Sequence, residues 1–334
     1  MRISELGGEQ ALIKLIAGKF GAPAATELVK SIGDDTAVIN IGDKALLLTS
    51  DMLIEKTHFR RDIVDPYSLG WKSVAVNISD IAAMGGTPAY TIVSLGVGDI
   101  EVEWIEECYK GIADCCEAYG SALIGGDTCV SLGGEIWSVF QVGFAYKEHV
   151  LYRSKALPGD AVMVTGTLGR SRAGLELLLK KGLREAYSTN PGAAAAHLRP
   201  TPRVAEGALL AEMGVAACMD LSDGLASDLP KLCEASGVGV EIESASIPCD
   251  TAAAGQIGWD AERLAIEGGE DYELLFTTPP EKTEAIINAF NEKGLAEVTR
   301  IGTVLEGESI TVVFSDGRTE ALAGGWQHFP KGES

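Results

Sequence analysis

The sequence predicts a two-domain protein of the mixed α/β (α+β) class, because apolar strand-like and helical segments alternate along both halves. Its 334 residues suit two domains better than one. An apolar fraction of 46% and a charged fraction of 22% are typical of a globular chain. A polar stretch from Lys147 to Pro158 separates two apolar strands. We therefore expect domains of residues 1–148 and 149–334.

In the first half, local signals predict most elements. Apolar residues recur at helical spacing from Glu9 to Phe20, before Gly21 and Pro23. Asp65 followed by Pro66 is typical of a helix start, an N-cap carboxylate with proline at the first helical position. That helix is expected to run to Met84, and another over residues 101–119. The expected strands are residues 36–41, 45–49, 90–97, 122–124 and 136–146, with a hairpin turn at 42–44.

The second half repeats the alternation. Expected strands are residues 161–165, 217–219, 272–277, 298–304 and 309–314, and expected helices are 171–181, 203–213, 225–236 and 281–293. Residues 190–202 are rich in Ala and Pro and are interpreted as a connector. No short repeat of the solenoid type is present.

Charge and missing motifs exclude several functional classes. A formal net charge of −21 argues against a nucleic-acid surface, because no basic patch could displace counterions. The chain has no P-loop and no G-x-G-x-x-G after a strand. Four scattered histidines and seven scattered cysteines have no zinc-binding spacing, and the cysteines are typical of reduced thiols in the cytoplasm. We expect no secretory signal and no membrane span.

Acidic residues cluster where predicted elements end, often beside hydroxyl side chains. A single such residue is commonly a cap or a turn. Several at similar junctions favour a shared role as hard oxygen ligands for magnesium ions, which in turn suggests a polyphosphate ligand. The first of these sites follows an apolar strand at Thr49, Ser50 and Asp51. The other acidic members are Asp35, Asp80, Asp127, Asp220 and Asp223.

Other residues admit two interpretations each. His58 is a packed histidine or a ligand contact, and Arg153 is a surface charge or a phosphate clamp. Trp326 anchors the core or stacks on a planar ring. The loop 166–169 is a tight turn or a phosphate cradle at a helix start.

Seven segments together resemble the thiamine-monophosphate kinase family, within the superfamily of aminoimidazole ribonucleotide synthetase and selenophosphate synthetase. They occur in the same order as in that family and cover nearly the whole chain. The selenophosphate branch carries a catalytic Cys or selenocysteine in a Gly-rich N-terminal segment, and this chain has none there. The matching segments are IGDDTAV (32–38), LTSDMLIEKTHF (48–59), WKSVAVNISDIAAMGGTP (71–88), LIGGDT (123–128), VTGTLG (164–169), MDLSDGLASDL (219–229) and GGEDYELLFT (268–277).

The resemblance implies ATP-dependent phosphorylation of thiamine monophosphate to thiamine diphosphate, with several Mg²⁺ ions, in a cytoplasmic homodimer. It implies an N-terminal sheet-plus-helices domain whose strands build a dimer barrel, and a C-terminal α/β sandwich domain. Implied ATP contacts are Gly126, Asp127, Arg153, Ser222 and Tyr109. Implied substrate contacts are His58, Glu270 and Trp326. Implied magnesium ligands are Asp35, Thr49, Ser50, Asp51, Asp80, Asp127, Asp220 and Asp223.

No catalytic base is expected, because the acceptor is itself a phosphate that is largely ionised at neutral pH. We expect direct in-line transfer assisted by the metal ions. Two alternatives stay open at this point. One is another ATP-dependent synthetase of the superfamily, and the other is a non-catalytic sensor of nucleotide or thiamine phosphate. Neither membrane nor nucleic acid is an expected partner.

Overall fold

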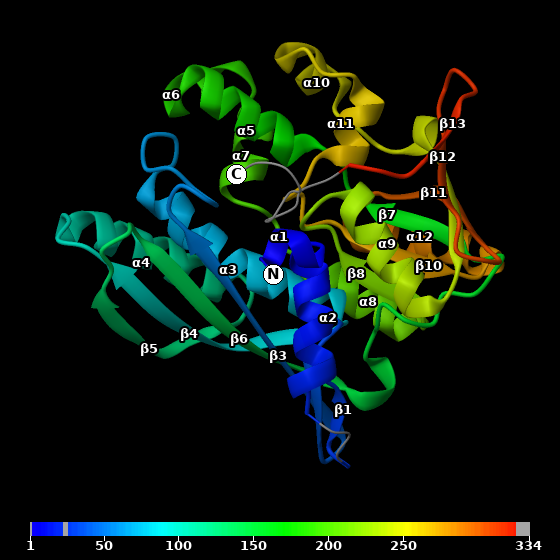
Figure 1. The fold of residues 1–334 in the computed structure, drawn as a ribbon, viewed down its shortest axis with the longest axis horizontal. Coiled ribbons are helices and arrows are strands. Elements are labelled where there is room, and N and C mark those ends of the chain that lie inside the picture. The colour runs from blue at the N-terminus through cyan, green and yellow to red at the C-terminus, as the bar shows by residue number, and fades with distance from the viewer. Residues whose placement is uncertain (1, 23–25, 325–334) are drawn as a thin grey trace.

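A computed structural model describes residues 2–22 and 26–324. Two sheets and their helices make up the mixed α/β fold expected from the sequence (Figure 1). No helix in these ranges has the length and apolar character needed to cross a membrane. All seven cysteines are free, and Cys129 alone is exposed.

The N-terminal sheet has six strands in the order β1-β2-β3-β6-β4-β5. Only β4 and β5 pair in parallel. Helices α3 and α4 pack together on this sheet, with Trp137 of β6 fully buried beneath them. The bounds are α1 Ile3–Leu6, α2 Glu9–Phe20, β1 Leu28–Lys30, β2 Ala37–Ile41, β3 Lys44–Ile54, α3 Pro66–Ala83, β4 Thr87–Val97, α4 Val102–Ala118, β5 Ala122–Val130, β6 Ile136–Tyr146 and the 3₁₀ turn η1 Lys147–His149.

The C-terminal sheet has seven strands in the order β13-β12-β9-β11-β7-β10-β8. Helices α9 and α11 bury apolar side chains on one face of it, and α8 and α12 do so on the other. Bounds are β7 Ala161–Thr165, α5 Arg170–Lys181, α6 Leu183–Thr189, α7 Pro191–Leu198, α8 Val204–Met213, β8 Ala217–Asp220, α9 Leu225–Ser236, β9 Gly239–Glu243, η2 Ser244–Ser246, α10 Thr251–Ile257, α11 Ala261–Glu267, β10 Leu274–Thr278, η3 Pro280–Lys282, α12 Thr283–Lys293, β11 Val298–Leu305, β12 Ile310–Val313 and β13 Thr319–Ala321.

Helix α3 contacts both halves of the molecule, packing on the N-terminal sheet and against α8 and β8 of the C-terminal half. It begins as predicted, with the Asp65 carboxylate accepting the Ser68 N–H at 2.8 Å and Pro66 in the first turn. On the C-terminal side, helix α8 approaches it closely at Gly207. A Cβ atom there would lie 2.0 Å from the Ala82 carbonyl oxygen, so only glycine permits this contact. The polar residues of α3 are thereby held against the C-terminal half.

The expectation that residues 190–202 form a connector without regular structure is wrong. Residues Pro191–Leu198 form helix α7, which packs on α5 above the N-terminal sheet (Figure 1). Asn190 caps it by accepting the Ala193 N–H at 3.0 Å, and Pro191 occupies the first turn. The alanines bury a small apolar face, so the composition that suggested a linker instead permits close helix packing.

Candidate active site

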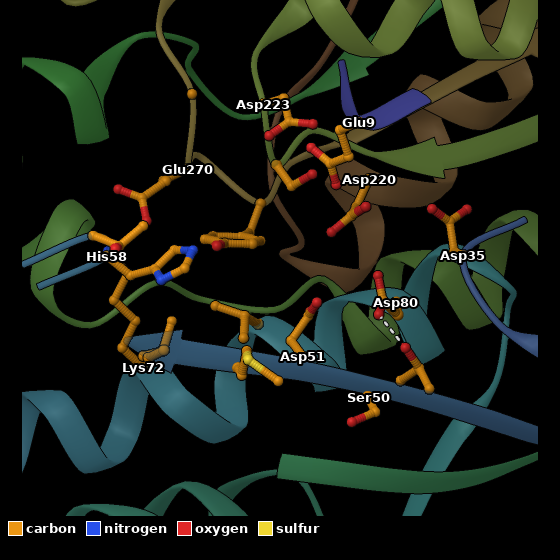
Figure 2. A pocket seen from close by; sticks show the side chains of 18 of the residues that line it. Glu9, Asp35, Ser50, Asp51, His58, Lys72, Asp80, Asp220, Asp223 and Glu270 are labelled. Atoms are coloured by element: carbon orange, nitrogen blue, oxygen red, sulfur yellow. Dashed lines mark hydrogen bonds and ion pairs between the residues drawn. The ribbon is translucent and has the colours of Figure 1, made fainter. Parts of the chain in front are cut away.

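A cavity of about 1150 Å³ lies between the N-terminal sheet, helix α3 and the loops after β8 and α11. Its lining includes seven of the residues singled out from sequence at element ends and turns. They come from both halves of the chain (Figure 2). These residues are Asp35, Thr49, Ser50, Asp51, Asp80, Asp220 and Asp223.

Strand β3 carries Thr49 and Asp51 in its middle, which corrects the expectation that the strand ends there. The antiparallel ladder with β6 continues without interruption to the pair Ile54 and Ile136. Backbone pairing therefore holds these polar residues in extended conformation. Thr49 Oγ1 donates to Asp80 Oδ2 at 2.5 Å, and the Asp51 N–H donates to the Asn77 side-chain oxygen at 2.8 Å.

Ser50 lies between these two residues on β3, and its side chain points to the opposite face of the strand from Asp51 (Figure 2). Only its neighbours therefore present side-chain oxygens to the aspartate cluster. Its expected role as a metal ligand stays a prediction.

Three aspartates from different elements meet at one end of the cavity. One carboxylate oxygen from each of Asp35, Asp80 and Asp220 lies within 4.8 Å of the other two. Burial, followed by the charges of neighbouring aspartates, raises the pKa of Asp80 and of Asp220 well above the usual range. Ser79 Oγ donates to Asp220 Oδ2 at 2.6 Å. Buried carboxylates this close need a proton or a cation between them.

The donor set fits a hard divalent cation. All the converging atoms are oxygens, as magnesium prefers. The second oxygen of Asp35 is buried and has no hydrogen-bond partner in the described structure. Enclosure by protein atoms, then the charge of Asp223, raises the pKa of Asp51 to about 6. Asp35, Asp51, Asp80 and Asp220 could therefore hold magnesium.

Two basic side chains already pair with members of this cluster. The Arg153 guanidinium contacts the Asp35 carboxylate, and the Arg153 N–H donates to Asp34 at 3.2 Å. Lys231 of α9 lies 2.7 Å from Asp223 and 2.7 Å from the fully buried Asp228. The side chains of Arg153 and Lys231 could thus bind phosphate, and in this structure both are paired with carboxylates.

The other end of the cavity holds Glu270, which is predicted to contact substrate. Its carboxylate lies 2.9 Å from Lys72 Nζ and 3.2 Å from His197 Nδ1. His58 lies nearby (Figure 2), and its Nδ1 accepts the Ile54 N–H at 3.0 Å, which fixes the ring. Apolar side chains of Phe59 and Leu198 also line this part of the cavity.

Sequence reasoning missed Lys72 and His197. Lys72 lies on the same side of α3 as Val76 and Asp80, at a spacing of four residues, and all three line the cavity. That spacing was a usable signal. His197 had none, because helix α7 itself was interpreted as a connector.

The loop 166–169 leads into helix α5, and the carboxylate of Asp271 binds the backbone N–H groups at the start of that helix. Asp271 accepts the backbone N–H groups of Gly169 at 2.5 Å and Ser171 at 2.9 Å. Burial raises the pKa of Asp271 to about 7. The tight-turn interpretation is therefore correct, and the first turn of α5 leaves no such cradle for a phosphate.

Known proteins resemble this chain along nearly its whole length. The N-terminal domain model of AIR synthase related proteins matches residues 33–145, and the C-terminal domain model matches residues 158–315. A thiamine-monophosphate kinase of Aquifex aeolicus is 40% identical and covers 98% of this chain and 100% of its own. The chain belongs to the thiamine-monophosphate kinase family.

Further relatives agree with this assignment. The thiamine-monophosphate kinase of Escherichia coli K12 is 37% identical over 84% of this chain and 89% of its own length. The solved structure of AaThiL complexed with AMPPCP and TMP has a TM-score of 0.86 and 39% identity, and covers 98% of this chain and 99% of that chain. The hydrogenase maturation protein HypE of E. coli, at 19% identity and a TM-score of 0.68, shares the fold.

Several residues implied by the resemblance to thiamine-monophosphate kinases lie away from the cavity. Gly126 and Asp127 lie in the middle of the exposed edge strand β5, not after a short strand, because pairing with β4 continues to Val130. Tyr109 packs edge-on against Trp137, 5.9 Å between ring centres.

Ser222 does line the cavity of this family member, and its carbonyl oxygen accepts the Glu270 N–H at 2.7 Å. Trp326 lies outside the described residues. The ligand roles expected for all these residues stay predictions.

Proposed function

We propose that this protein transfers the γ-phosphoryl group of ATP to the phosphate of thiamine monophosphate, forming thiamine diphosphate. The observation that carries the proposal is a single cavity with two chemically different ends. Asp35, Asp80 and Asp220 suit metal-bound polyphosphate at one end, and Glu270 with His58 suits an organic cation at the other. The relatives named as thiamine-monophosphate kinases, and the relative solved with AMPPCP and TMP, support it.

The residues of the chain have positioning and electrostatic roles in this mechanism. Magnesium, when bound, would neutralise the charge of the phosphate oxygens. Arg153 and Lys231 supply fixed positive charge beside the aspartates. No side chain needs to remove a proton, because the acceptor phosphate has a second pKa near 6 and is largely ionised at neutral pH.

Direct in-line transfer is the simplest chemistry for this arrangement, since the acceptor oxygen is already a nucleophile. A chiral, isotopically labelled γ-phosphoryl group then inverts its configuration on transfer. Net retention would contradict direct transfer and point to a phosphoenzyme.

We also propose a homodimer and the division into domains 1–148 and 149–334. Strand β5 is exposed along its whole length and leaves an edge of the N-terminal sheet open. Large apolar side chains are exposed along the same sheet, among them Ile124 at 57% and Val130 at 78%. Pairing of two such sheets would cover both and would form the expected barrel. A cytoplasmic location stays a prediction based on cysteine usage.

The decisive experiment measures ADP release in a coupled assay with ATP, magnesium and thiamine monophosphate, and identifies thiamine diphosphate by chromatography. We expect release only with all three present. A synthetase of the superfamily would instead respond to an aminoimidazole precursor, and a sensor would bind both ligands without releasing ADP. Absence of turnover with thiamine monophosphate would refute the proposed function.

A further inference from the structure

Glu270 is held by side chains from two other elements at the end of the cavity away from the aspartates. Lys72 comes from α3 in the N-terminal half, and His197 comes from α7 in the C-terminal half. Figure 2 shows Lys72, His58 and Glu270 together at one end of the cavity, with Asp35, Asp80 and Asp220 at the other. Phosphoryl transfer at the aspartate end of the cavity needs neither Lys72 nor His197.

The backbone at Glu270 adopts a conformation that a glutamate rarely takes. Its φ is +66°, in the left-handed region. The loop is held there because the Glu270 N–H donates to the Ser222 oxygen at 2.7 Å. Gly269 packs so tightly that a Cβ on it would lie 2.9 Å from that same oxygen. Strain of this kind persists where the surroundings impose it, and it is common at ligand sites. The carboxylate is thus placed in the cavity at a cost in local conformation.

The charges around Glu270 keep it ionised. Burial alone would raise its pKa, but the positive charge of Lys72 opposes burial, and the pKa of Glu270 lies below the usual range. His197 itself is neutral, because burial and the neighbouring Lys72 lower its pKa to about 3. Its Nδ1 lies 3.2 Å from both Glu270 Oε2 and Ser171 Oγ. One buried ammonium and one neutral imidazole therefore fix a single carboxylate.

The ion pair between Lys72 and Glu270 is buried on the lysine side and does not lie on the protein surface. Its side chain is only 5% exposed, and its Nζ has no hydrogen-bond partner in the described structure beyond the ion pair with Glu270. Burying an ammonium is costly unless a carboxylate compensates it. A purely structural role would be met more cheaply by an apolar residue of similar size.

We propose that Lys72 and His197 are positioning residues that present Glu270 as a fixed anionic acceptor to the organic part of the phosphate substrate. The inference rests on the proposed function and goes further by assigning selectivity to this triad. Thiamine monophosphate offers a thiazolium cation and an amino group that donates hydrogen bonds, and an ionised carboxylate suits both. Simple phosphate monoesters offer neither, so the triad selects against them.

The test is a double-mutant cycle with Lys72→Met, Glu270→Gln and the combined variant, assayed for KM of both substrates. Each single change is expected to raise KM for thiamine monophosphate about tenfold to hundredfold, as expected when one partner of a buried charge pair is removed. KM for ATP should change less than about threefold, since the other end of the cavity is intact. Because Lys72 acts through Glu270, the combined variant should be no worse than Glu270→Gln alone.

Two further variants complete the design. Lys293→Met makes the same substitution at an exposed site on α12, away from the cavity lining, and should leave both KM values unchanged. His197→Gln, cycled with Glu270→Gln, gives an independent measure if Lys72→Met does not fold. Effects that multiply in the combined variants, or an equal rise in KM for ATP, would refute the inference while leaving the proposed function intact. A wild-type protein inactive on thiamine monophosphate would refute both.

Discussion

Replacing Asp51 by Asn should stabilise the metal-free protein while abolishing most turnover. Asp51 opens onto the cavity, and burial raises its pKa most, followed by the charges of Asp223, Glu9 and Asp35. Asn has nearly the same shape and cannot ionise. The substitution therefore removes the cost of enclosing a negative charge and its repulsion by the neighbouring carboxylates, both of which a bound cation would offset.

The magnitude follows from the pKa. A rise from 3.8 to about 6 is equivalent to about 3 kcal/mol at about 1.4 kcal/mol per pH unit. Asp51 is surrounded by protein atoms but its surface is exposed to the solvent in the cavity, so screening reduces this figure, and we expect about 1–2 kcal/mol. The wild-type penalty is absent below pH 4, where the group is protonated in both states. It grows as pH rises from about 4 to about 6 and is complete above that.

Thermal unfolding in EDTA between pH 4 and pH 8 tests this directly. Asp51→Asn should match wild type near pH 4 and unfold a few degrees higher at pH 7.5. Saturating magnesium should reverse the order at pH 7.5, and turnover of the variant should fall at least a hundredfold. A variant less stable than wild type in EDTA at pH 7.5, or an advantage independent of pH, would refute the reasoning. Unchanged turnover would remove Asp51 from the metal site.

Three other outcomes are expected. Magnesium should raise the melting temperature of the wild type more at pH 7.5 than at pH 5, because Asp51 must lose its proton to bind; equal gains in calorimetry would contradict this. Asp271→Ala should lower the free energy of unfolding in urea by about 1–2 kcal/mol, because it uncaps α5, whereas the exposed cap variant Asp260→Ala should cost less. Ile124→Glu should convert a dimer to a monomer in light scattering, while Leu179→Glu on α5 should not.

Where local chemistry decides an element, the sequence predicts it well. Helix α2, strand β6 and helix α9 have the bounds expected from periodicity. The start of α3 was predictable because Asp65 and Pro66 act on the adjacent turn alone. Local sequence signals predict no element over residues 237–267, and these residues contain β9, α10 and α11. Short segments of this kind are stabilised mainly by what they pack against.

Strands β3 and β5 were predicted too short for a related reason. The polar residues from Thr49 to Asp51, and the glycines before Asp127, look like strand ends in isolation. Pairing with β6 and with β4 keeps both segments extended. The aspartate cluster was predictable by residue type and position. The contacts of Lys72 and His197 with Glu270 were not, because they join three elements far apart in the sequence.

Arg153, which is predicted to contact ATP, and Asp35, which is predicted to bind magnesium, form an ion pair with each other. Arg153 contacts one oxygen of the Asp35 carboxylate, and the other oxygen has no hydrogen-bond partner in the described structure. A magnesium ion bound to Asp35 would weaken this ion pair and favour contact of the guanidinium with phosphate, and a phosphate bound to Arg153 would likewise favour metal binding at Asp35. We therefore expect the binding of metal and of nucleotide to be thermodynamically linked, and by reciprocity each should tighten the other by the same factor. The pair thus favours ATP that arrives with its cation over either component alone.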